Sequence, residues 1–78
     1  MAVHERIEIN PNIMLGKPVI RGSRITVELI LRKISEGVDE TALLQAYPQL
    51  TREDIQAAAS YAADMLAHEE VLTTPAGQ

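Results

Sequence analysis

Residues 50–66 read LTREDIQAAASYAADML, and this stretch decides the fold class. Thr51 is followed three positions later by Asp54, the acidic variant of the capping box that starts a helix. Neither proline nor glycine interrupts the residues that follow. Apolar positions with helical spacing continue as one stripe, namely Ile55, Ala58, Ala59, Ala62, Met65 and Leu66. We expect the longest helix of the molecule here.

Two shorter helices are predicted upstream. Between Val27 and Ile34 the apolar residues again follow the helical period, with Thr26 as N-cap and Gly37 as the stop. The second helix spans roughly residues 40–47, with Asp39 as N-cap, and Pro48 disfavours helical geometry at the residue before it. Its predicted inward side chains are Leu43, Leu44 and Tyr47.

All three predicted helices begin with the same device, an apolar residue before the cap and another five positions later. Such a pair is a hydrophobic staple, which fixes the angle at which the chain enters a helix. The pairs are Ile25 with Ile30, Val38 with Leu43, and Leu50 with Ile55. Three stapled helices joined by short turns predict a compact trihelical unit, and Glu36-Gly37-Val38 has the length of a helix-turn-helix corner.

The first quarter of the chain is divided by turn residues into apolar pieces too short for helices. Arg6 to Ile9 alternates with period two, as a short strand does, and Val19-Ile20 and Ile25 flank Gly22-Ser23, a pair suited to a two-residue II′ hairpin turn. We therefore predict a mainly α fold, with a small N-terminal β-hairpin region followed by a three-helix, helix-turn-helix-like bundle.

The boundaries follow from these elements. One domain is expected over residues 1–72, divided into a β- and turn-rich arm at 1–26 and the trihelical unit at 27–70, with a flexible tail at 73–78. The chain has 78 residues and no Cys, so disulfides, thiolate zinc sites and thiol nucleophiles are excluded. A domain of this size buries only about 60% of its unfolded surface, so a second subunit would help it. No signal peptide or membrane span is evident, which predicts a cytoplasmic location.

The catalytic motifs that the sequence suggests are all incomplete. Gly16-Lys17 resembles the end of a phosphate-binding P-loop, but Pro11 stands where that motif needs its first glycine. The zinc motif HExxH is begun at His4 and at His68, yet its second histidine is missing in both cases. The serines lack a neighbouring histidine to activate them. We expect no enzyme, no metal and no cofactor.

The net charge of −4 conceals an uneven distribution. Residues 1–35 hold six basic and three acidic side chains, a net +3, whereas residues 36–78 hold one basic and eight acidic ones, a net −7. The predicted second and third helices are acidic, so phosphate would be repelled by them. Any contact with an anion or with DNA is expected in the basic half, at Lys17, Arg21, Gly22, Arg24, Arg32 and Lys33.

Within that set, Arg21 and Arg24 would face each other across the predicted two-residue turn. Like charges in that arrangement are unfavourable unless an anion or a carboxylate lies between them. The anion could be a DNA phosphate, an RNA phosphate or an acidic patch on a second subunit, and the alternative is two solvated arginines paired with local acids such as Glu28. For partner or dimer contact the alanine-rich third helix offers Tyr61, Met65 and Leu66, although alanine is also simply a strong helix former.

The run from Asn10 to Val27, NPNIMLGKPVIRGSRITV, followed by Gly37, by Tyr47-Pro48-Gln49-Leu50-Thr51 and by Asp54-Ile55, closely resembles the domain-of-unknown-function family 433. The resemblance covers about residues 6–68, and Ser23 replaces the threonine usual in that family. It implies a small homeodomain-like helix-turn-helix protein, and a VapB-type antitoxin encoded beside a PIN-like ribonuclease toxin. Contact residues carry over only at the motif positions Gly16, Lys17, Arg21, Gly22 and Arg24.

The expected function is therefore that of a non-enzymatic, dimeric antitoxin-like protein or transcriptional regulator that binds operator DNA, a PIN-like toxin, or both. The acidic half would suit a toxin with a basic RNA-binding surface. The alternative is a protein-interaction module that forms homo-oligomers and does not bind DNA.

Overall fold

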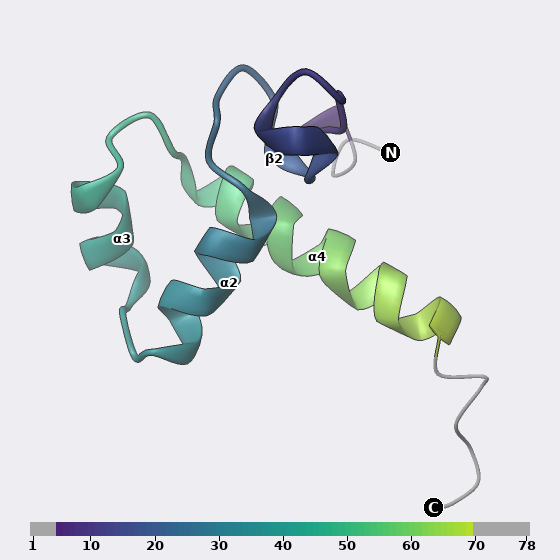
Figure 1. Cartoon of the computed structure of the whole chain (residues 1–78). Helices are drawn as coiled ribbons and strands as arrows, with labels where there is room; N and C mark the ends of the chain where they lie inside the picture. The colour runs from purple at the N-terminus through teal and green to yellow at the C-terminus, as the bar shows by residue number, and fades with distance from the viewer. Residues whose placement is uncertain (1–4, 70–78) are drawn as a thin grey trace, which may run out of the picture.

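The computed structural model describes residues 5–69, and for Glu69 the backbone only. The expected end of the domain at residue 72, the tail at 73–78 and His4 lie outside this range. The chain is mainly helical, with a short two-stranded N-terminal hairpin followed by three helices, as the sequence predicts (Figure 1). No helix in the described range is both long and apolar enough to cross a membrane.

The hairpin consists of β1 (Ile7–Glu8) and β2 (Val19–Ile20), which pair antiparallel with Ile7 opposite Ile20. The strand predicted over residues 6–9 is thus reduced to its two central residues. Ile7, Val19 and Ile20 are buried, so the strands serve mainly to place aliphatic side chains over the helices. A single bridge from Val19 to Thr26 then leads the chain into the first helix.

The turn after β2 differs from the prediction. The loop has four residues, 21–24, closed by an Ile20 N–H to Ile25 O bond of 2.9 Å. Inside it, the Ser23 N–H donates to Ile20 O at 3.0 Å, which places Gly22, with φ 82°, at the third turn position, as in a type II turn. The Ser23 hydroxyl donates to Ile20 O and accepts from the Ile25 N–H. The prediction of a two-residue II′ turn was wrong, because this hydroxyl stabilises the wider four-residue loop.

The first two helices have the predicted ends. Helix α2 (Val27–Ser35) begins where Thr26 Oγ1 accepts from Leu29 N–H at 2.9 Å, and α3 (Glu40–Ala46) begins with the equivalent bond from Ala42 N–H to Asp39 Oδ1. The end of α2 is a Schellman motif: Gly37 N–H donates to Ile34 O, and Val38 N–H donates to Lys33 O. Gly37 has φ 91°, a conformation that glycine adopts without strain.

Helix α4 (Arg52–Glu69) carries the capping box in both directions. Asp54 N–H donates to Thr51 Oγ1 at 3.1 Å, and Thr51 N–H donates to Asp54 Oδ2 at 3.0 Å. The other oxygen of Asp54 accepts from Arg6 at 3.1 Å. Asp54 is only 7% exposed, so this residue links the start of β1 to the start of α4.

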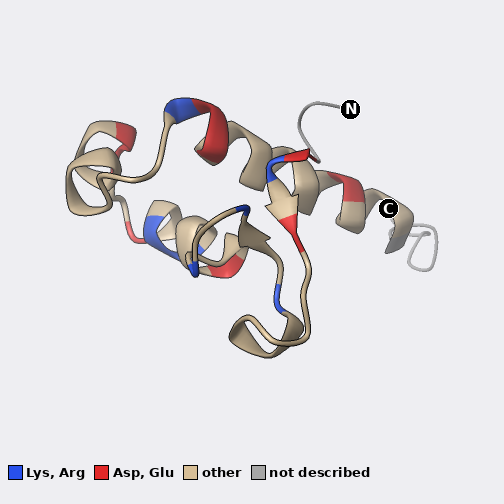
Figure 2. Ribbon diagram, turned by 90° about the horizontal axis from the view of Figure 1, so that it is seen from above, with Lys and Arg blue, Asp and Glu red and all other residues tan. Residues whose placement is uncertain are grey.

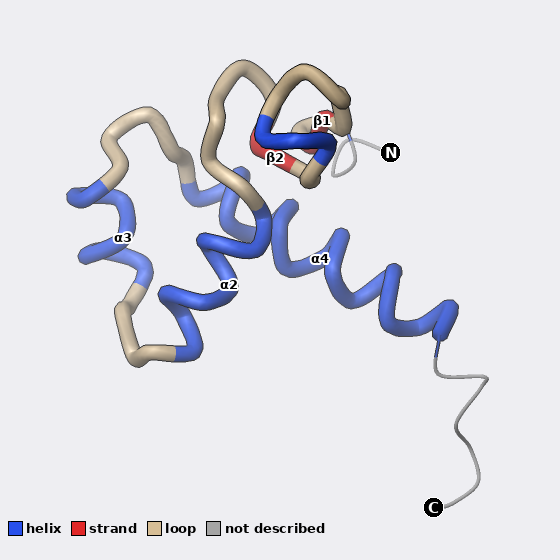
Figure 3. The backbone as a smooth tube through the Cα atoms, in the orientation of Figure 1, coloured by secondary structure: helices blue, strands red, loops and turns tan. Residues whose placement is uncertain are grey.

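The core lies where the hairpin, α2, α3 and the first half of α4 meet (Figures 1 and 3). Its buried members come from both strands and all three α-helices and include both partners of the staples at α2 and α4; they are Ile7, Ile20, Ile25, Val27, Ile30, Leu43, Leu50, Ile55, Ala57 and Ala58. Two predicted inward residues are instead exposed, Ile34 and Ala59. The second half of α4 runs past the other elements and projects from the molecule (Figure 1).

Candidate functional site

The predicted basic residues Lys17 and Arg32 meet at one carboxylate. Lys17 Nζ lies 3.1 Å from Glu28 Oε1, and Arg32 Nη2 lies 3.0 Å from Glu28 Oε2. Glu28 and Arg32 are one turn apart on α2, the spacing at which helical side chains meet. Lys17 reaches the same place from the loop before β2, which is tied to α2 by a Val27 N–H to Pro18 O bond.

The two cations act on the ionisation of Glu28. The hydrogen bond from Lys17 lowers the pKa of this carboxyl most, and the hydrogen bond from Arg32 lowers it further. Glu28 is therefore firmly ionised at neutral pH. With two cations and one carboxylate, this ion-pair network keeps a net charge of +1.

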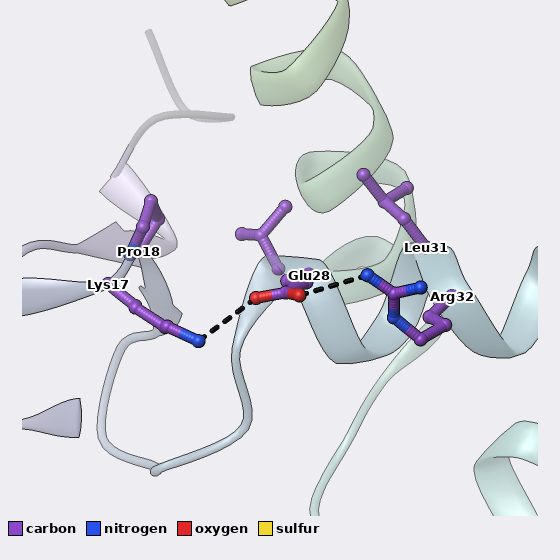
Figure 4. A pocket seen from close by; sticks show the side chains of 6 residues that line it. Lys17, Pro18, Glu28, Leu31 and Arg32 are labelled. Carbon is purple, nitrogen blue, oxygen red and sulfur yellow. Dashed lines mark hydrogen bonds and ion pairs between the residues drawn. The ribbon is translucent and has the colours of Figure 1, made fainter.

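Beside the network lies a surface pocket with a volume of about 490 Å³. Figure 4 shows Lys17 and Arg32 reaching Glu28 from opposite sides, with Pro18 and Leu31 flanking them. Val27 completes the apolar wall. We call this the α2 pocket: an open, mainly apolar hollow whose rim carries three charged groups.

The other predicted anion-binding residues are placed differently. Arg21 turns back to the hairpin, where Nε donates to Glu5 O at 2.6 Å and Nη2 to Ile7 O at 3.1 Å. The premise that Arg21 and Arg24 face each other across a two-residue turn was wrong, since Arg21 donates to backbone carbonyls of the hairpin and its neighbour. An anion at Arg24 stays a prediction. Gly22 supplies the positive φ of the loop, a structural role.

Arg24 and Lys33 belong neither to the ion-pair network at Glu28 nor to the contacts of Arg21. Lys33 Nζ lies 3.8 Å from Glu36 on α2. Arg24 has no ion pair with any residue of the described range, and it lines a second hollow of about 240 Å³ together with Glu8 and Gly22. Most Lys and Arg segments lie beside acidic ones rather than on one continuous basic face (Figure 2).

The residues predicted for partner contact divide into two kinds. Tyr61 is half-buried and packs against the core. Met65 and Leu66 lie farther along α4, where they are 49% and 64% exposed. His68, which looks in sequence like the start of a zinc motif, donates from Nδ1 to Asp64 O of its own helix at 2.8 Å, and no group of three metal-binding side chains occurs among residues 5–68.

Comparison with known proteins identifies the family. The model of a family described as "Protein of unknown function (DUF433)" matches residues 7–62. The chain belongs to the DUF433 family. A crystal structure of a DUF433 member from Anabaena variabilis superposes with a TM-score of 0.75 at 33% identity, covering 81% of this chain and 62% of that one. The uncharacterised protein y4eO of Sinorhizobium fredii is 34% identical over 61 residues, 78% of this chain. The chain spans only 28% of the length of that relative.

One exposed feature of this DUF433 chain was not predicted from the sequence. The short helical turn η1 (Met14–Gly16) is left-handed, with φ of 49° at Met14, 58° at Leu15 and 84° at Gly16. The turn is held by Gly16 N–H to Ile13 O and Lys17 N–H to Met14 O bonds. Leu15 at its tip is 93% exposed. Glycine marks the turn in the sequence, but residue type does not foretell positive φ at two bulky neighbours.

An acidic surface lies at the α3 end of the molecule. Residues 36–54 contain five acidic side chains and a single basic one, a net charge of −4. Arg52 Nε lies 3.1 Å from Glu40 Oε2, so the starts of α3 and α4 are adjacent. The acidic surface consists of the side chains that remain at least partly exposed there, Glu36, Asp39, Glu40 and Glu53.

Proposed function

We propose that this DUF433 chain is a non-enzymatic, antitoxin-like protein that binds a basic protein partner through its acidic surface. The observation that carries the proposal is the way charges are paired. In the predicted basic patch, Lys17, Arg32 and Lys33 are already paired with Glu28 or Glu36, and the guanidinium of Arg21 donates to backbone carbonyls. On the acidic surface, by contrast, Asp39 and Glu53 form no ion pair within residues 5–68.

The class of partner follows from electrostatic complementarity. A negative surface attracts a positively charged protein and repels phosphate, and long-range attraction of this kind raises the association rate. Ribonucleases bind a polyanion and so need a basic surface, as the PIN-like toxin implied by the family resemblance would have. An antitoxin that covers such a surface would block its RNA without any catalytic group of its own.

The test is co-expression with the product of the adjacent gene, followed by purification of the complex and measurement of its affinity. Glu53→Lys reverses a charge on the acidic surface at an exposed residue that has no ion pair along residues 5–68. We expect it to weaken the complex by at least about tenfold and to reduce the salt dependence of the association rate. Glu5→Lys makes the same charge change at the hairpin end and should leave the affinity unchanged. A neighbour that is not toxic, or that does not co-purify, would refute the proposal.

Operator binding is the second candidate, and Arg24 is the observation that favours it. Its exposed guanidinium carries no ion pair within residues 5–68, so it is the basic group best able to take a phosphate. Titrating DNA from upstream of the gene against salt should give a steep loss of affinity, and Arg24→Ala should lower the slope by about one. Lys33→Ala, which removes an already paired cation, is the control. Absence of binding at low salt excludes this candidate.

A further inference from the structure

The α2 pocket has the chemistry of a docking site for an apolar, acidic segment. Its wall consists of Pro18, Val27 and Leu31, and its rim carries Lys17 and Arg32 against one carboxylate. Its volume of about 490 Å³ falls within the roughly 300–1,000 Å³ typical of binding pockets. An occupant that fits must offer aliphatic side chains to the wall and a negative charge to the rim.

The projecting half of α4 is complementary to this pocket, because it combines exposed apolar side chains with a negative charge. We call residues 60–68 the α4 end; it carries Met65 and Leu66 exposed, with Asp64 beside them and no Lys or Arg. From residue 63 onward every side chain of this segment is exposed. An isolated helix of two or three turns is marginal in water, so most helical stability has to come from packing. Within residues 5–68, Met65 and Leu66 therefore lack the packing that apolar side chains on a helix require.

We propose that two copies of this chain exchange these surfaces, with the α4 end of each copy docked in the α2 pocket of the other. Met65 and Leu66 then cover the apolar wall at Leu31. The carboxylate of Asp64 approaches the positive rim near Arg32. Each copy contributes one projecting segment and one pocket, so a single two-fold operation satisfies both and the assembly closes as a dimer.

A second copy is favoured over an unrelated partner by the charge distribution of the chain itself. The pocket rim keeps a net charge of +1, and the α4 end carries one carboxylate, Asp64, and no Lys or Arg. The α4 end points away from α2 in its own molecule, so this segment does not reach the α2 pocket of its own chain (Figure 1). A domain this small also gains most from burying surface against a copy of itself.

The test is self-association of the full chain by sedimentation equilibrium with two matched charge reversals on α2. Arg32→Glu changes the pocket rim from a net +1 to −1, whereas Lys33→Glu makes the same change one residue away, outside the pocket. Both side chains are at least partly exposed and each loses one surface ion pair. We expect Arg32→Glu to weaken the dimer at least about tenfold and Lys33→Glu to leave it near wild type.

Mixing two variants tests the exchange itself. Asp64→Arg reverses the charge that the α4 end brings to the rim, and it should weaken the dimer at least about tenfold, as Arg32→Glu does. In a mixture of the two variants, one docked contact keeps the wild-type charges and the other has both charges reversed, so both contacts are attractive, whereas each homodimer contains two like-charge contacts. The mixture should therefore form heterodimers more tightly than either variant forms homodimers. Thermal melts at low concentration check that both variants fold.

Three results would overturn the inference: a wild-type chain that stays monomeric up to millimolar concentration, equal behaviour of Arg32→Glu and Lys33→Glu, or no preference for the heterodimer. If the interface consisted instead of two α4 ends, Arg32→Glu and Lys33→Glu would behave alike. These outcomes are independent of the proposed antitoxin function. Capture of the basic partner through Glu53 by a monomeric chain would refute only the dimer, and a dimer that captures no partner would refute only the antitoxin function.

Discussion

Replacing Leu15 with asparagine should make the protein more stable. Leu15 has φ 58° and ψ 31°, in the left-handed region, where an ordinary L-residue is destabilised by roughly 1–2 kcal/mol. Asparagine adopts this region more readily, because its short polar side chain hydrogen-bonds locally. The side chain of Leu15 is 93% exposed, so its loss forfeits almost none of the roughly 1.5–3 kcal/mol that full burial of a leucine contributes.

The net expectation is a gain of about 0.5–1.5 kcal/mol in the free energy of unfolding. For a domain of this size each kcal/mol raises the melting temperature by about 4–8 °C. Circular dichroism melts and urea titrations of both proteins give the difference. The measurements belong at two protein concentrations, because self-association would add to the apparent stability.

Ile34→Asn is the matched control, since Ile34 is also an exposed aliphatic residue but lies in α2 with negative φ. It should be neutral or slightly destabilising, because asparagine is no better than isoleucine inside a helix. A lower melting temperature for Leu15→Asn would refute the reasoning. It would mean that Leu15 makes a stabilising contact which outweighs its backbone strain.

Three further predictions concern the described contacts. Asp54→Ala should lower the free energy of unfolding by about 1–2 kcal/mol, because it leaves the Thr51 amide without an acceptor. Replacing Arg6, its half-exposed ion-pair partner, with alanine should cost only about 0.2–1 kcal/mol. Equal losses in urea titrations of the two variants would contradict the capping role of Asp54. An NMR titration should give the Glu28 carboxyl a pKa below the usual value for glutamate, and Lys17→Gln should raise that pKa. Because folding lowers this pKa, the pairing stabilises the fold above the pKa of the unfolded chain. That stabilisation is lost as the pH falls through the pKa of the folded chain. Ile30→Ala, at a fully buried site, should cost about 2–5 kcal/mol by calorimetry.

The helices could be predicted because their signals are local. Thr26, Asp39 and Thr51 each cap a helix through a residue two or three positions ahead, and Gly37 ends α2 through bonds within six residues. Such interactions are fully specified by neighbours in the sequence. The turn at Gly22 was predicted wrongly because a serine hydroxyl offered the backbone two hydrogen bonds that a count of turn residues does not include.

The candidate site could be predicted only as a list of residues. Counting charges found Lys17 and Arg32, but their shared carboxylate depends on the loop before β2 packing against α2, a contact between residues 11 positions apart. The same count gave Arg21 a free charge, although its guanidinium is bound by carbonyls of β1 and the residues before it. Charge content is a property of the sequence, whereas available charge is what remains after folding has paired it.

That difference also favours one of the two proposed functions over the other. A chain whose basic half were free would favour phosphate, and the family resemblance alone would then point to an operator. In the folded chain Lys17, Arg32 and Lys33 are each paired with a carboxylate, so binding DNA there would first require those pairs to break or to share their cations. The acidic surface requires no such exchange, because Glu53 and Asp39 form no ion pairs within residues 5–68. Binding a basic protein is thus the interaction for which this fold needs the least rearrangement.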